Sequence, residues 1–111
     1  MKELVQLHCS PVEGNTPRLA GRDISQLKEK LPGWETHTKK GELHLEKSFQ
    51  FKDFRQALTF TNRIAQLANE EDHHPAILTE WGQVTVTWWT HKIKGLHLND
   101  FIMAAKTDQL H

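Results

Sequence analysis

The segment from Asp53 to about Glu71 constrains the fold most, because it reads as one helix between two pairs of strand-like segments. Asp53 can cap its first turn, with Gln56 at the partner position of a capping box. Two adjacent apolar stripes follow at helical spacing: Phe54, Ala57, Leu58, Ala65 and Ala68 form one, and Phe60, Ile64 and Leu67 the other. Such a wide face can cover a sheet with one stripe and contact a second subunit with the other, or serve one deep core.

Alternating apolar and polar residues on both sides of this helix predict two hairpins. Before the helix, residues 34–38 and 42–50 are separated by the turn at 39–41; after it, residues 76–81 and 84–90 are separated by Gly82-Gln83. Short turns imply antiparallel pairs. Lys47 interrupts the apolar face of the second strand, which indicates a strand end or a sheet edge.

Two further helices complete the order α-β-β-α-β-β-α. Asp23 can cap a helix that ends before Pro32-Gly33, and a last helix spans about Leu98 to Lys106. This order predicts an α+β fold with a four-stranded antiparallel sheet and three helices packed on one face. We expect residues 1–22 to be an irregular leader and residues 23–111 a single domain. The architecture alone does not identify an activity.

Composition excludes several classes of function. The 14 basic and 14 acidic residues balance, so no net field favours nucleic acid or an anionic membrane. No apolar run approaches the roughly 20 residues that span a bilayer, and the first eight residues lack the hydrophobic region of a signal peptide. Cys9 is the single cysteine and cannot form an internal disulfide. We therefore expect a cytoplasmic protein without nucleic-acid or membrane partners.

The tract Asp-His-His-Pro at 72–75 carries the chemistry, together with His91 and Asp100. Histidine can donate or accept a proton near neutral pH. His73 and His74 follow the end of the long helix, where the helix dipole favours a cation. His91 follows the fourth strand, and Asp100 falls in the first turn of the last helix. These groups can therefore converge on one cleft.

The spacing resembles the pterin-4a-carbinolamine dehydratases. His73-His74-Pro75 matches the core of that family's pattern; Trp81 follows after five intervening residues, His91 after nine more and Asp100 after eight more. The first position of the pattern is Asn69, where the family has Glu, Asp, Lys or His. The similarity covers roughly residues 19–106 and includes the tracts at 31–34, 51–54, 90–91 and 95–96. The leader, with Cys9-Ser10-Pro11 and Glu13-Gly14, is similar to that of bacterial and plant members.

This resemblance implies a hydro-lyase that converts 4a-hydroxytetrahydropterin to quinonoid dihydropterin during tetrahydropterin recycling. It implies that His73 and His91 are the acid and base, in an order left open, and that His74 mainly holds the substrate. No cofactor or metal is implied. It further implies a homodimer or homotetramer formed through the long helix, and a functional link to an aromatic amino-acid hydroxylase.

Supporting roles follow for five more residues. Asp100 either orients a histidine and raises its basicity or only stabilises its own helix. Trp81 and Trp34 either stack on the flat pterin ring or pack in the core. Asp72 and Pro75 complete the expected substrate site. We expect the remaining histidines to be surface residues: His8, His37, His44, His97 and His111.

Two other functions stay open on sequence alone. Members of the family also act as dimerisation cofactors for a transcription factor, so the chain could be a non-catalytic binding module that uses the wide helix face. Alternatively, Asn69 at the departed position could mark a different pterin, as in molybdopterin metabolism. A metal site is disfavoured because adjacent histidines rarely chelate one ion and the long helix has no histidine pair at i, i+3 or i+4.

Overall fold

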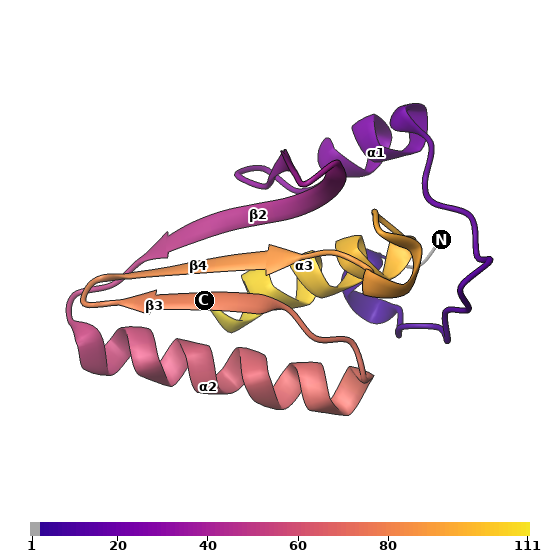
Figure 1. Ribbon diagram of the computed structural model, residues 1–111. Coiled ribbons are helices and arrows are strands. Elements are labelled where there is room, and N and C mark those ends of the chain that lie inside the picture. The colour runs from indigo at the N-terminus through magenta and orange to yellow at the C-terminus, as the bar shows by residue number, and fades with distance from the viewer. Residues whose placement is uncertain (1–2) are drawn as a thin grey trace.

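The computed structural model describes residues 3–111, and it confirms the predicted α+β fold (Figure 1). The sheet has the strand order β1-β2-β4-β3 with antiparallel neighbours, and the three helices pack against one face. The first two residues of the expected leader lie outside this description. The elements are η1 (Leu4–Gln6), α1 (Gly21–Lys28), β1 (Glu35–Lys39), β2 (Glu42–Gln50), α2 (Phe54–Glu71), β3 (Ala76–Glu80), β4 (Gln83–Trp88), η2 (His91–Ile93) and α3 (Leu98–Leu110).

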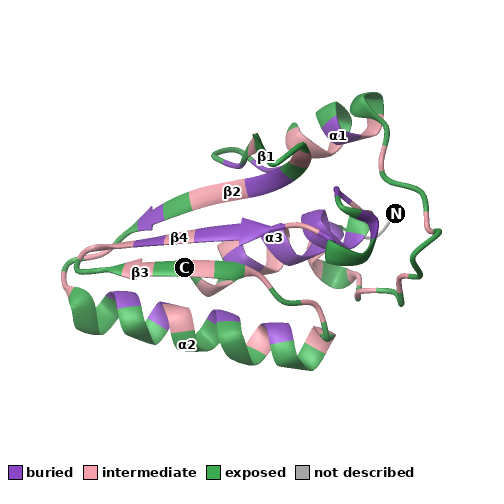
Figure 2. Cartoon of the chain, in the orientation of Figure 1, coloured by how far each residue is buried: buried purple, intermediate pink, exposed green. Residues whose placement is uncertain are grey.

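The core lies between the sheet and helices α2 and α3, where Figure 2 shows the buried residues of β4 and α3. The predicted alternation of β4 is confirmed, because Val84, Val86 and Trp88 are each 0% exposed. α3 is buried on almost every side over its first two turns. Its buried residues include Phe101, Ile102, Met103 and Ala104. A helix this enclosed can hold functional groups at its first turn in a fixed position.

The two predicted stripes of α2 are divided differently from the expectation. Residues from both stripes meet the sheet, namely Ala57, Phe60, Ile64 and Ala68. Phe54 and Leu58 instead point away and are 46% and 42% exposed. The core therefore uses only part of the apolar face of α2. The part that carries Phe54 and Leu58 is exposed to solvent.

Lys47 lies in the middle of an inner strand, so its expected position at a strand end or sheet edge is wrong. Its Nζ lies 2.9 Å from Asp108 Oδ1 and 4.9 Å from the centroid of the Phe49 ring. Trp34 Nε1 also donates to Asp108, at 3.1 Å. The lysine thus keeps its charge paired and its stem against aromatic rings, which explains how a cation fits on the apolar face of β2.

Three predicted boundaries also shift. α1 begins at Gly21 after an Ala20 cap, and Asp23 occupies its first turn, where an acid is also favoured. β4 ends at Trp88 rather than residue 90, because Thr90 bridges Gly95 and the chain then turns into η2. α3 continues past residue 106 to Leu110. No helix among residues 3–111 combines the length and the apolar character needed to cross a membrane.

Candidate active site

The end of α2 delivers the His-His pair to the site. Asp72 adopts a left-handed conformation with φ 53°, and its backbone N–H donates to Ala68 O. The backbone N–H of His73 donates to the same carbonyl oxygen at 3.2 Å. This hydrogen-bonded stop fixes where the helix ends and projects His73 and His74 from the short connection to β3.

Asp100 holds the ring of His73. Its carboxylate is 0% exposed, and Oδ1 lies 2.7 Å from His73 Nε2. The second oxygen, Oδ2, accepts from Thr90 Oγ1 at 2.8 Å and from the His97 backbone N–H at 3.0 Å. The His73 ring also lies parallel to the Trp88 indole, with centroids 5.9 Å apart and planes 9° apart. Because the carboxylate accepts from Nε2–H, Nδ1 is left as the nitrogen for a substrate.

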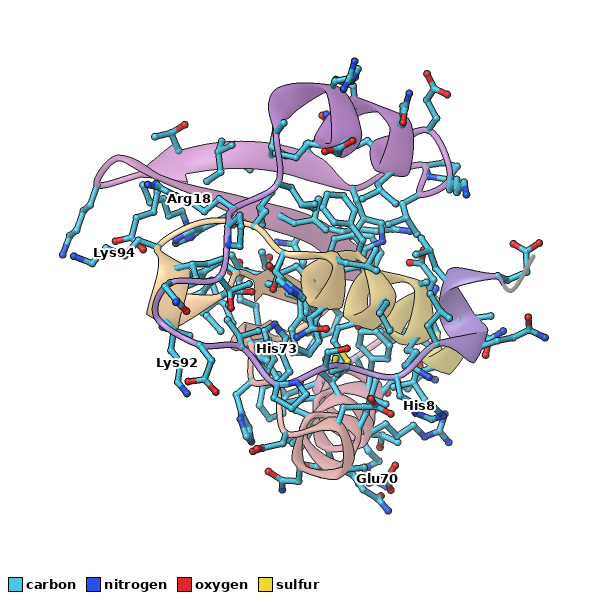
Figure 3. All side chains as sticks on the ribbon, turned by 90° about the vertical axis from the view of Figure 1, so that its right-hand side faces the viewer. His8, Arg18, Glu70, His73, Lys92 and Lys94 are labelled. Atoms are coloured by element: carbon cyan, nitrogen blue, oxygen red, sulfur yellow. The ribbon has the colours of Figure 1, made fainter. Side chains whose placement is uncertain are left out.

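The three candidate catalytic histidines line one cavity of about 410 Å³, a volume suited to a small bicyclic ligand. In Figure 3, His73 lies behind the N-terminal segment and Lys92 lies at the same end of the molecule. His74 Nε2 is 3.0 Å from Asn69 Oδ1, and the exposed His91 packs on Trp89 with centroids 4.4 Å apart. The full lining comprises Ser10, Pro11, Val12, Glu13, Asp72, His73, His74, Thr90, His91, Lys92 and Asn99.

The structure brings only some of the predicted site residues together. Asp72 shares the cavity with the three histidines, and Asp100 stands behind His73. Pro75 is next to His74 in sequence but does not line the cavity.

The two candidate ring-stacking tryptophans lie elsewhere. Trp34 is 1% exposed and committed to the core and Asp108, so its expected contact with substrate is corrected to core packing. Trp81 sits in the turn between β3 and β4, is 70% exposed, and is not part of the cavity lining.

His44 contradicts the expectation of a surface histidine, because Trp89 covers it. It is 7% exposed, its ring lies 4.0 Å from the Trp89 ring, and among the described residues its buried Nδ1 has no hydrogen-bond partner. Burial, followed by the nearby charge of Lys39, lowers the pKa of His44 below its usual 6.5. His97 Nδ1 also has a structural task, since it accepts from the Asn99 backbone N–H at the start of α3.

Sequence reasoning missed the groups that support the histidines. Thr90 and the His97 backbone complete the hydrogen bonds of Asp100. Asn69 was noted only as a departure from the family pattern, and its hydrogen bond with His74 was not expected. Thr90 has a signal in hindsight, since it immediately precedes His91. The part played by residues 10–13 was also missed: the leader resembles that of family members, but these residues are distant in sequence from every histidine of the cavity. Within residues 3–111, no three His, Cys, Asp or Glu side chains form a group that could hold a metal ion.

Comparison with known proteins identifies the family. The sequence pattern of the family described as Pterin 4 alpha carbinolamine dehydratase matches residues 17–110, so the chain belongs to this family. It is similar to the crystal structure of a transcriptional coactivator/pterin dehydratase from Brucella melitensis, with 32% identity and a TM-score of 0.76 over 85% of this chain and 98% of that one. It is also similar to a pterin dehydratase-like protein described as a RuBisCO assembly factor in the alpha-carboxysome, with 26% identity and a TM-score of 0.60 over 70% of this chain and 88% of that one.

Proposed function

We propose that this protein is a dehydratase that converts 4a-hydroxytetrahydropterin to quinonoid dihydropterin and water by histidine acid/base catalysis. The observation that carries the proposal is the single cavity shared by His73 and His91, which come from different segments of the chain. Membership of the dehydratase family supports the pterin as substrate. In the cell, this activity would serve cytoplasmic regeneration of the pterin used by an aromatic amino-acid hydroxylase.

The reaction needs two proton transfers and no net transfer of electrons. An imidazolium donates a proton to the 4a hydroxyl as the C4a–O bond breaks and water departs. A neutral imidazole removes the proton from N5, and the N–H electron pair forms the C4a=N5 double bond. One histidine on each side of the ring can perform these steps, and each positioned acid or base contributes about 10²–10⁴-fold.

Asp100 supports His73 without contacting the substrate. With Nε2–H donated to Asp100, Nδ1 of His73 can act as base when the ring is neutral and as acid when it is protonated. The parallel Trp88 ring limits rotation of the imidazole. We assign His74 to holding the substrate, because it lines the cavity and its ring is held by a hydrogen bond with Asn69.

Single-alanine variants of the two histidines test the proposal. His73→Ala and His91→Ala should each lower kcat at least tenfold in a stopped-flow assay of carbinolamine breakdown, with unchanged circular dichroism. His37→Ala is the control, since His37 is exposed on β1 and lies outside the cavity. The assay with and without a chelator tests the expectation that no metal takes part. Wild-type turnover in both variants would overturn the assignment.

A second candidate is a non-catalytic protein-binding module. The exposed apolar residues Phe54 and Leu58 on α2 favour it, since they could receive a partner helix. The second similar structure is described as an assembly factor, which shows that a relative has been given a role other than catalysis. Absent carbinolamine breakdown, together with binding of a helical partner that Leu58→Glu abolishes, would favour the module.

A further inference from the structure

The N-terminal segment is fastened alongside the histidine cavity, and its residues 10–13 are part of the cavity lining. The Cys9 backbone N–H donates to Glu71 Oε1 at 2.8 Å. The Ser10 N–H donates to Asn99 Oδ1 at 2.9 Å, and Asn99 Nδ2 donates back to the Ser10 carbonyl at 2.8 Å. Lys92 Nζ then donates to the Val12 carbonyl at 3.2 Å. Figure 3 shows the resulting path, in which the segment crosses in front of His73 and passes Lys92.

Asn99 is the central clamp of this arrangement. It is 2% exposed, both polar atoms of its side chain bond to one backbone residue, and it immediately precedes Asp100. In the first turn of α3, Asp100 therefore orients His73, and Asn99 holds the N-terminal segment. A buried amide satisfied at both ends gives a fixed rather than an adaptable contact.

Residues 10–13 belong to the cavity but not to the family match. All four line the cavity, whereas the family pattern matches from residue 17 onwards. The wall is thus formed by leader residues that precede the part of the chain matched by the family pattern.

We propose that residues 10–13 form a substrate-binding wall of the dehydratase site, and that Asn99 and Lys92 are positioning residues for this wall. The inference rests on the proposed function. Pro11 and Val12 offer apolar contact to a flat ring, while Glu13 joins Asp72 as a carboxylate lining the cavity. An aminopyrimidine edge carries N–H donors, so these carboxylates suit the pterin class of ligand.

Kinetics of three variants test the wall. Lys92→Met and Asn99→Ala release one attachment each, and Val12→Phe adds bulk to the wall itself. Each should raise KM for the carbinolamine at least fivefold, and in Lys92→Met the increase in KM should exceed any decrease in kcat. Lys52→Met is the matched control, because Lys52 is an exposed lysine outside the cavity. Lys92→Arg should restore KM if the lysine acts through its bond to Val12.

The alkylation rate of Cys9 reports whether the N-terminal segment is still attached. This rate would not change if Lys92 or Asn99 acted only by contacting the substrate. Cys9 Sγ lies 3.9 Å from the Asn99 carbonyl oxygen, and burial, followed by the charge of Glu71, raises the pKa of the Cys9 thiol to about 12. Release of the segment should therefore accelerate alkylation by iodoacetamide at pH 8 at least tenfold in Asn99→Ala and measurably in Lys92→Met. A raised KM with wild-type alkylation rates, or wild-type KM in all three variants, would overturn the wall.

Binding of a stable 7,8-dihydropterin separates this inference from the proposed reaction. If the wild type binds this probe but shows no turnover, the dehydratase proposal fails while the wall can still be judged. The wall then predicts that bound dihydropterin slows alkylation of Cys9 and that Val12→Phe weakens binding at least fivefold. Unchanged alkylation and unchanged affinity would refute it, as would failure of the wild type to bind the probe.

Discussion

Asp100 contacts His73 through Oδ1, 2.7 Å from Nε2, while its other oxygen is occupied by two donors from a neighbouring loop. Those donors, the Thr90 hydroxyl and the His97 N–H, require an acceptor at Oδ2. Because Oδ2 is engaged by Thr90 and His97, Oδ1 is the oxygen that faces His73. This arrangement specifies which nitrogen of the imidazole carries the proton.

Asp100→Asn should move the proton of the neutral His73 ring from Nε2 to Nδ1, while keeping the shape of the side chain at position 100. The amide oxygen would remain at the Oδ2 position to accept from Thr90 and His97, so the amide NH2 would face His73 Nε2. His73 would then carry its proton on Nδ1, and a neutral ring could no longer accept a proton there. We expect kcat to fall at least tenfold with little change in KM.

Nitrogen-15 NMR of the histidine rings checks the tautomer directly. Asp108→Asn is the control, because it makes the same chemical change on the same helix, at a residue that bonds Trp34 and Lys47. It should cost stability but leave kcat of the folded protein near the wild-type value. Normal turnover in Asp100→Asn with a reversed tautomer would show that the proton on Nε2 is not required.

His44 should make the fold sensitive to mild acid. Burial and then Lys39 lower its pKa below 6.5, so the folded protein keeps it neutral where the unfolded chain would bind a proton. The free energy of unfolding is therefore unaffected by this group above about pH 6.5 and decreases as the pH falls below that value. Urea unfolding should show a smaller loss of stability between pH 7.5 and 5.5 in His44→Phe, whose ring can still stack on Trp89.

His37→Phe is the control for this effect, since His37 is exposed on the edge strand β1. It should retain the wild-type slope of stability against pH. The carboxylates Glu46 and Glu71 act in a lower range. Burial raises the pKa of each, but hydrogen bonds (from Thr87 and Lys39 to Glu46, from Cys9 and His8 to Glu71) and nearby positive charges together outweigh burial and lower both pKa values below 4.5. Parallel curves for wild type and His44→Phe would contradict the prediction.

The sequence was sufficient to predict the three α-helices, the four strands, their order and the histidines of the cavity, because these depend on local periodicity and on spacing. The short helices η1 and η2 were not predicted. Long-range polar partners could not be predicted in the same way. Lys47 reads as an interruption of an apolar face until Asp108, 61 positions away, is placed beside it. The same carboxylate accepts a hydrogen bond from Trp34 Nε1 and so helps to hold Trp34 in the core.

The same limit applies to the site. Asp100 was a candidate from its spacing, but its bonds to Thr90 and the His97 backbone depend on the loop that the Thr90–Gly95 bridge closes. His44 was misjudged because its burial comes from Trp89 on another strand-loop segment. Sequence periodicity predicts on which face of its helix or strand a residue lies. Whether that residue is buried, and which charges lie near it, depends on the residues that the fold places opposite that face.

Trp34 and Trp81 should differ in what they stabilise. Trp34→Ala removes a buried indole and leaves Asp108 with fewer donors, so it should lower the free energy of unfolding by about 3–5 kcal/mol. Trp81→Ala changes a side chain that is 70% exposed and should stay within about 0.5 kcal/mol of the wild type. Urea titrations measure both. A more than tenfold loss of kcat/KM in folded Trp81→Ala would restore Trp81 as a substrate contact.

The exposed apolar residues of α2 should mediate self-association. Phe54 and Leu58 lie one helical turn apart on the side of α2 that faces away from the sheet, and a self-complementary patch is what a symmetric interface requires. Leu58→Glu would place a charge in that contact and should shift a homodimer or homotetramer towards a smaller species in sedimentation velocity. Thr59→Glu is the control, because it adds the same charge at the next exposed residue, on another side of the helix. Identical sedimentation of wild type and Leu58→Glu, whether both are monomers or both are oligomers, would exclude this side of α2 as the interface.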